Sequence, residues 1–190
     1  MKRMKVIFVN MQATWHIPIT KTILALSKSD KDFAVHMAIW FSEVNDGNGR
    51  EMNEVIFEAK APTSGFIDGT TYDEEPTKYV FEFEVPDEAY ESGIKEALAD
   101  ENILYGLFTD CIATVVKDNT GSIVTDKLNC ERTAICSELG MRILHAMFPD
   151  FGLDGDGNEL DYNTISPCEA YHLFEEYAPT NSDINMISQG

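Results

Sequence analysis

The sequence predicts an α+β domain, in which short strands and amphipathic helices follow one another in mixed order. The first observation is that apolar runs with strand spacing and apolar residues with helical spacing both recur along the 190 residues. The second is that a chain of this length, 44% hydrophobic, is sufficient for one well-packed core and short for two. We therefore expect residues 1–190 to form a single domain, with a loose C-terminal tail over about residues 179–190.

Four segments have the character of strands. Residues 5–10 form a short apolar run, and residues 33–41 are almost continuously apolar, which indicates a strand covered on both faces. One histidine, His36, lies inside this second strand. Residues 53–59 and 79–85 complete the set, and the last of these alternates cleanly, as expected of a half-exposed strand.

A hairpin is expected between the second and third strands, because residues 45–49 are rich in Asn, Asp and Gly, which tolerate a positive φ. If these five residues form the loop, His36 lies directly across from Glu58. A register shift that preserves parity would keep both side chains on one face of the sheet, either as a diagonal pair or with Glu54 nearer to the ring.

The remaining segments are expected to form helices and loops. Pro18 and Pro86 precede helical patterns, and Ser166 opens the last helix with a capping box and a proline at the first helical position. The expected helices cover residues 19–26, about 87–98, 103–116 with Cys111, 136–148, and about 167–178. Loops are expected at residues 60–77, 119–122 and 149–161. The first of these is long enough to line or cover a cleft.

The helix that begins near Cys136 carries the most informative residue of the chain. Thr133 is the expected N-cap, and the helix is amphipathic, with a buried face formed by Leu139, Ile143, Leu144 and Met147. Cys136 is then in the first turn, where the helix dipole favours thiolate over thiol. A cysteine in this position is a nucleophile if an imidazole comes within hydrogen-bond distance. His145 is too far along the same helix to be that base.

Composition excludes several classes of partner and location. The net charge of −19 repels phosphate backbones, so nucleic acid and anionic membrane surfaces are poor partners. The apolar run near the N-terminus is too short for a signal peptide, and no segment has the ~20 apolar residues of a membrane span. We therefore expect a cytoplasmic protein whose four cysteines are reduced thiols.

No metal or other cofactor is expected. The tract at residues 154–158 suggests a calcium loop, but Glu159 stands where an EF-hand requires glycine and Ile165 where it requires glutamate. A solvated turn is the better interpretation. Cys168 and His172 are one helical turn apart, yet the other cysteines lack the paired spacing of a zinc site.

The order of the histidine strand, the glutamate strand and the cysteine helix resembles the circularly permuted branch of the NlpC-type papain-like fold, the YiiX-like proteins, which are related to lecithin:retinol acyltransferase-like proteins. The matching segments are residues 33–39 around His36, Val55-Ile56-Phe57-Glu58-Ala59, Cys136-Ser137-Glu138-Leu139 and Thr164-Ile165-Ser166-Pro167. The family pattern has a Tyr-Asp pair before the cysteine, whereas Tyr105 is followed here by Gly106.

The resemblance implies a papain-like fold with a central antiparallel sheet packed against the nucleophile-bearing helix. It implies that Cys136 is the nucleophile, His36 the base and Glu58 the residue that orients the imidazole. The expected activity is that of a thiol hydrolase, of the amidase, peptidase or acyl-transfer type, on a peptide, cell-wall-derived or lipid amide or ester. The alternative is a catalytically silent papain-like binding protein or virion structural component. The oligomeric state is left open.

Overall fold

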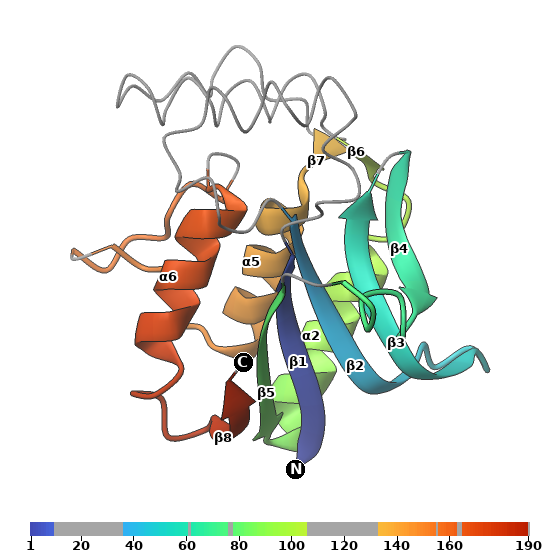
Figure 1. Cartoon of the computed structure of the whole chain (residues 1–190), viewed down its shortest axis with the longest axis horizontal. Helices are drawn as coiled ribbons and strands as arrows, with labels where there is room; N and C mark the ends of the chain where they lie inside the picture. The colour runs from blue at the N-terminus through green and yellow to red at the C-terminus, as the bar shows by residue number, and fades with distance from the viewer. Residues whose placement is uncertain are drawn as a thin grey trace.

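A computed structural model describes residues 1–9, 36–60, 62–75, 78–105, 133–154, 156–162 and 165–189 of the chain. This part of the chain is an α+β structure with one sheet of eight strands and three helices (Figure 1). The expected helix over 19–26, the turn over 119–122 and residues 33–35 of the second expected strand lie outside these described residues. None of the helices in the described part of the chain is both long and apolar enough to cross a membrane.

The sheet has the strand order β7-β6-β4-β3-β2-β1-β5-β8. All neighbouring strands pair antiparallel except β6 and β7, which are parallel. The strands are β1 (Lys2–Val9), β2 (His36–Asn45), β3 (Glu51–Lys60), β4 (Thr63–Asp68), β5 (Lys78–Val85), β6 (Leu104–Tyr105), β7 (Thr133–Ala134) and β8 (Asn185–Gln189). The four expected strands are therefore confirmed as β1, β2, β3 and β5, with shifted ends.

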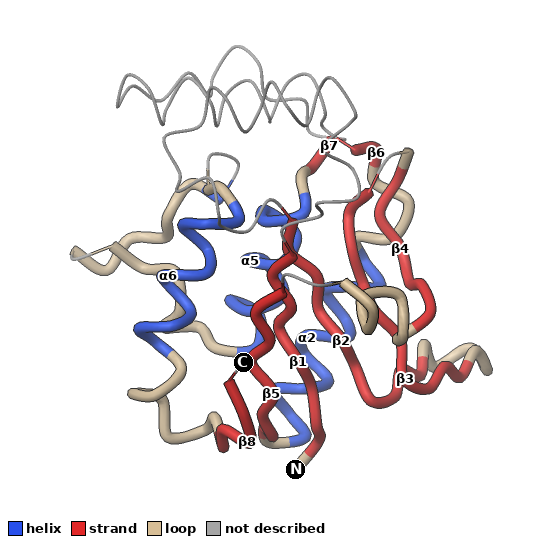
Figure 2. The backbone as a smooth tube through the Cα atoms, in the orientation of Figure 1, coloured by secondary structure: helices blue, strands red, loops and turns tan. Residues whose placement is uncertain are grey.

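Three expectations are corrected by the remaining strands. The expected loop over 60–77 contains β4, which pairs with β3, and the expected helix over 103–116 begins instead with β6. The tail expected to be loose contains β8, which lies beside β5 (Figure 2). Short strands of this kind are fixed by pairing with a neighbour that is distant in sequence, so local sequence pattern indicates them poorly.

The helices α2 (Asp87–Ala99), α5 (Cys136–Met147) and α6 (Pro167–Tyr177) pack on one face of the sheet around the main core. Alternate residues of β2 divide between the two faces: Met37 and Ile39 face these helices, and Ala38 and Trp40 face the other side. A smaller apolar cluster on that second face consists of Ile7, Val9, Ala38, Trp40, Ile56 and Tyr72. The expected capping box at the start of α6 is confirmed.

The β2–β3 hairpin is present, but its register differs from the expected one by two residues. Its loop covers residues 46–50, with Asn45 opposite Glu51, so that Glu58 lies opposite Ala38 and diagonal to His36. Asp46 explains the shift, because its carboxylate accepts hydrogen bonds from the backbone N–H groups of Asn48 and Arg50 and closes the loop one residue later. Parity is preserved, so the two side chains stay on one face.

The close packing of α5 on β2 depends on Gly140. A β-carbon at this position would lie 2.5 Å from the sulfur and 3.1 Å from the γ-carbon of Met37, whose side chain is fully buried. Since Met37 follows His36 directly, the absence of a side chain at residue 140 lets α5 approach the start of β2.

We predict that Gly140→Ala destabilises the fold by up to about 2 kcal/mol. Overpacking against Met37 costs about 1–3 kcal/mol, which exceeds the ~1 kcal/mol that alanine gains over glycine in a helix interior. Denaturant unfolding measures the difference. Gly65→Ala in β4 is the control, because no atom lies within 4 Å of a β-carbon there. Equal stability of the two variants would contradict the close-packing argument.

Candidate active site

The three residues expected to form the site lie together in the structure. His36 is the first residue of β2, Glu58 lies near the end of β3, and Cys136 is the first residue of α5. The Nε2 atom of His36 is 2.6 Å from Oε2 of Glu58, and the His36 ring also forms a side-chain hydrogen bond with the Cys136 sulfur. Because Nε2 is hydrogen-bonded to Glu58, Nδ1 is the ring nitrogen that remains to form the hydrogen bond with the sulfur. We call this set the Cys136–His36–Glu58 cluster.

The start of α5 differs from the expected one in its cap. Thr133 belongs to β7, and the N-cap is Ile135, whose side chain makes no capping hydrogen bond. The first-turn N–H groups are therefore not satisfied by a cap residue. One of them, that of Ser137, donates to the Cys136 sulfur, and so does the N–H of Met37 in β2. A donor from the first turn of this helix was expected from the sequence, whereas the donor from Met37 in β2 was not.

Burial and charge oppose each other at the sulfur. Both Cys136 and His36 are buried, with 4% and 3% of their surface exposed. Burial alone would raise the pKa of the Cys136 thiol, but the His36 cation, the hydrogen bond from its ring and the two backbone donors together lower that pKa. Burial likewise lowers the pKa of His36, but the charge of the Cys136 thiolate and the hydrogen bonds to Cys136 and Glu58 raise it to about 10. The geometry therefore favours a thiolate–imidazolium pair.

Glu58, and not Glu54, is the carboxylate at the ring. Burial would raise the pKa of Glu58, but the hydrogen bond and the charge of His36, with a hydrogen bond from Tyr72 and the charge of Lys60, lower it. Glu58 is therefore an ionised partner for the imidazolium. Glu54 is exposed and has a left-handed backbone conformation, with φ at 50°.

Tyr72 was missed by the sequence analysis. Its hydroxyl donates to Oε2 of Glu58, and its ring centroid is 5.8 Å from that of His36. Tyr72 lies in the turn after β4, within the segment that was expected to line or cover a cleft. No periodicity or motif distinguished it from the other residues of that segment, because its role depends on the folding of the turn over the sheet.

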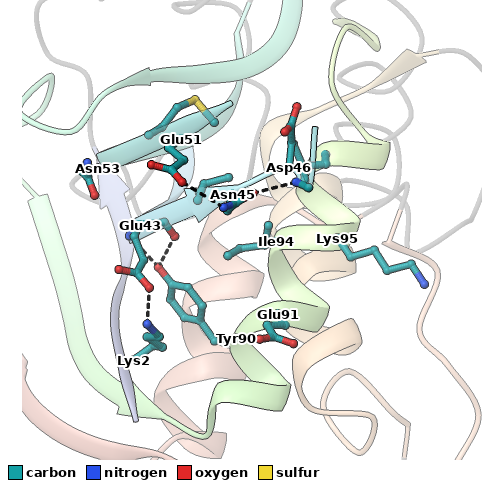
Figure 3. A pocket seen from close by; sticks show the side chains of 14 residues that line it. Lys2, Glu43, Asn45, Asp46, Glu51, Asn53, Tyr90, Glu91, Ile94 and Lys95 are labelled. Atoms are coloured by element: carbon teal, nitrogen blue, oxygen red, sulfur yellow. Dashed lines mark hydrogen bonds and ion pairs between the residues drawn. The ribbon is translucent and has the colours of Figure 1, made fainter. Parts of the chain in front are cut away.

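A pocket of about 740 Å³ lies at the opposite end of β2, between the β2–β3 hairpin and α2 (Figure 3). Its lining residues include Glu43, Asn45, Tyr90 and Lys95, and no member of the Cys136–His36–Glu58 cluster is among the described residues that line it. At about 3.3 Å per residue, the nine steps from His36 to Asn45 separate the cluster from this pocket by roughly 30 Å. The pocket is therefore not part of the candidate site.

The other histidines and cysteines among the described residues are outside the Cys136–His36–Glu58 cluster. His145 Nδ1 lies 2.7 Å from the carbonyl oxygen of Phe151, His172 is exposed on α6, and Cys168 is buried. Asp154 accepts hydrogen bonds from backbone N–H groups in its own turn. Among the described residues, no three His, Cys, Asp or Glu side chains are grouped so as to hold a metal ion. Cys111 and Cys130 lie outside the described residues.

Comparison with known proteins identified no relative of this chain. No protein-family model matches the chain, and searches of curated proteins and of solved structures returned no significant match. The geometry of the cluster is thus the basis for any functional proposal.

We predict that the midpoint of the acid limb of Cys136 alkylation by iodoacetamide lies below the ~8.5 of an ordinary thiol, because the surroundings lower the pKa of Cys136. The thiolate persists above the lowered pKa of Cys136 and the imidazolium persists below the raised pKa of His36, so the ion pair exists between the two values. An ordinary thiol such as glutathione loses about tenfold in rate per pH unit below ~8.5. Rates are measured by mass spectrometry of the Cys136 peptide. A midpoint at or above pH 8.5 would contradict the ion pair.

Proposed function

We propose that the protein is a thiol hydrolase with a papain-like arrangement, which cleaves or transfers an acyl group through an acyl-enzyme on Cys136. The observation that carries the proposal is the junction of a sulfur at a helix start, an imidazole and a carboxylate in hydrogen-bonded sequence. Thiol catalysis requires this set, in which each residue has a distinct task.

In the proposed first step, the Cys136 thiolate attacks the carbonyl carbon of an amide or ester. The imidazolium of His36, which holds the thiol proton, gives that proton to the departing amine or alcohol as the carbon–nitrogen or carbon–oxygen bond breaks. A thioester on Cys136 and a neutral imidazole remain. Glu58 keeps the ring in one orientation and stabilises its cationic form.

In the second step, the neutral His36 takes a proton from water, and the resulting hydroxide equivalent attacks the thioester carbon. The carbon–sulfur bond breaks, a carboxylic acid is released, and the thiolate–imidazolium pair is restored. If an alcohol or amine takes the place of water, the same step is acyl transfer. The N–H of Ser137, in the first turn of α5, donates to the Cys136 sulfur and so stabilises the thiolate that is released when the carbon–sulfur bond breaks.

We predict that Cys136→Ala lowers hydrolysis of p-nitrophenyl acetate, a small activated ester, by at least about 10³-fold, because no acyl-enzyme can form without the sulfur. An acetyl group on Cys136 should be detected by mass spectrometry after rapid quenching of the native protein. Cys168→Ala is the matched control, since Cys168 is also a buried thiol in the first turn of a helix. Hydrolysis that survives in Cys136→Ala would contradict the proposal.

A second candidate function is a non-catalytic papain-like binding or structural component. The observation that favours it is the burial of both Cys136 and His36, together with a pocket at the far end of β2. This candidate requires that iodoacetamide leave Cys136 unlabelled in the folded protein and label it only after denaturation. A stable assembly in size-exclusion chromatography, with the same protection of Cys136, would support it over the hydrolase.

A further inference from the structure

We propose that Tyr72 is a positioning residue of the Cys136–His36–Glu58 cluster, which fixes the carboxylate of Glu58 against the His36 ring and covers the pair on the face of the sheet away from α5. This inference rests on the proposed function, because it assigns a role in the chemistry of that same site.

Tyr72 contacts both members of the pair. Its hydroxyl donates to Oε2 of Glu58, the same oxygen that lies 2.6 Å from Nε2 of His36. Its ring is tilted by 51° to the His36 ring, and only 5% of its surface is exposed. Two donors on one carboxylate oxygen restrict rotation of the Glu58 carboxylate about its Cγ–Cδ bond. The carboxylate therefore keeps one orientation, and through its hydrogen bond to Nε2 it fixes the orientation of the imidazole.

The turn that carries Tyr72 is held at several points. After β4, the side chain of Asp68 accepts a hydrogen bond from the N–H of Thr70 at 2.8 Å. At the start of β5, the Lys78 ammonium donates to the carbonyl oxygens of Tyr72 and Asp73, each at 2.9 Å. These bonds tie the turn to the strands on both of its sides, so the position of the tyrosine is set by the backbone and not only by its ring.

Gly69 brings the same turn close to the sheet. A β-carbon at this position would overlap the carbonyl oxygen of Glu54 in β3 and lie 2.9 Å from Nε1 of Trp40. The turn can therefore pack directly on the sheet, and the Tyr72 ring joins the apolar cluster of the second face. The apolar surroundings exclude water from the far side of the His36–Glu58 pair, where its charges are then poorly screened.

The charges around Glu58 are consistent with this role. Burial would raise the pKa of Glu58, and the hydrogen bonds from His36 and Tyr72 lower it, so loss of the Tyr72 hydroxyl removes one of the groups that keep the carboxylate ionised. The Lys60 ammonium lies 5.9 Å from the Tyr72 ring centroid and adds positive charge nearby. When Glu58 is protonated, the imidazolium loses its partner and the thiolate at Cys136 becomes less stable in turn.

The test is Tyr72→Phe, which removes the hydroxyl and keeps the ring. We expect the acid limb of the pH profile of Cys136 alkylation by iodoacetamide to move up by about one pH unit, so that the rate falls by up to about tenfold on that limb and changes little on the plateau above it. For hydrolysis of p-nitrophenyl acetate, we expect kcat to fall by up to about tenfold on the acid limb of its pH profile, with KM unchanged, and to change little on the plateau.

Tyr90→Phe is the matched control. Tyr90 is buried, and its hydroxyl also bonds to β2, at Ser42 and Glu43, but at the end of the strand away from His36. Its removal should lower the free energy of unfolding by a similar amount and leave the pH profile of Cys136 unchanged. A second comparison uses Glu58→Gln: if Tyr72 acts through Glu58, adding Tyr72→Phe to that variant has no further effect on the acid limb.

The outcomes separate this inference from the proposed function. A profile of Tyr72→Phe that superimposes on that of a reactive native protein overturns the role of Tyr72 and leaves the hydrolase intact. A uniform loss of rate at every pH, with no shift of the acid limb, also overturns it, because the effect is then one of stability alone. If Cys136 of the native protein reacts with iodoacetamide no faster than an ordinary thiol, the proposed function fails, and the positioning role of Tyr72 fails with it.

Discussion

The contact between the start of α5 and the start of β2 is the constraint on which the rest of the candidate site depends. Gly140 permits this contact, since any side chain there would meet the buried Met37. The approach places the first-turn backbone of α5 and the N–H of Met37 at the same sulfur. The main core fixes the helix against the sheet from one side, and the ionic and hydrogen-bonding groups act only after that packing has brought them together.

The sequence predicted the parts of this arrangement that are local. Apolar residues at strand or helical spacing indicate the strand that contains His36, the strand that contains Glu58 and the helix that begins at Cys136. The capping box at Ser166 defines the start of α6. The proximity of Cys136 to His36 came from the resemblance and not from spacing, because it requires the tertiary fold. Glu58 lies on the same face of the sheet as His36 because the register differs from the expected one by an even number of residues.

The features that the sequence did not predict depend on single atoms or on partners far along the chain. The register followed the carboxylate of Asp46, which closes the hairpin loop one residue later than expected. The N-cap of α5 is Ile135 because Thr133 is drawn into β7. β8 is fixed by β5, about 100 residues earlier in the sequence, and Tyr72 reaches Glu58 only through a folded turn. No local pattern contains this information.

The Cys136–His36–Glu58 cluster extends around the end of β2. Cys136 belongs to the core beneath the helices, whereas the glutamate and the tyrosine that contacts it lie on the other side of the sheet. Two separate apolar layers must therefore be intact at once for the sulfur, the ring and the carboxylate to stay aligned. Local opening of either layer separates the proton donor from its acceptor while most of the sheet is still paired, so that the site is lost in subglobal fluctuations less costly than complete unfolding.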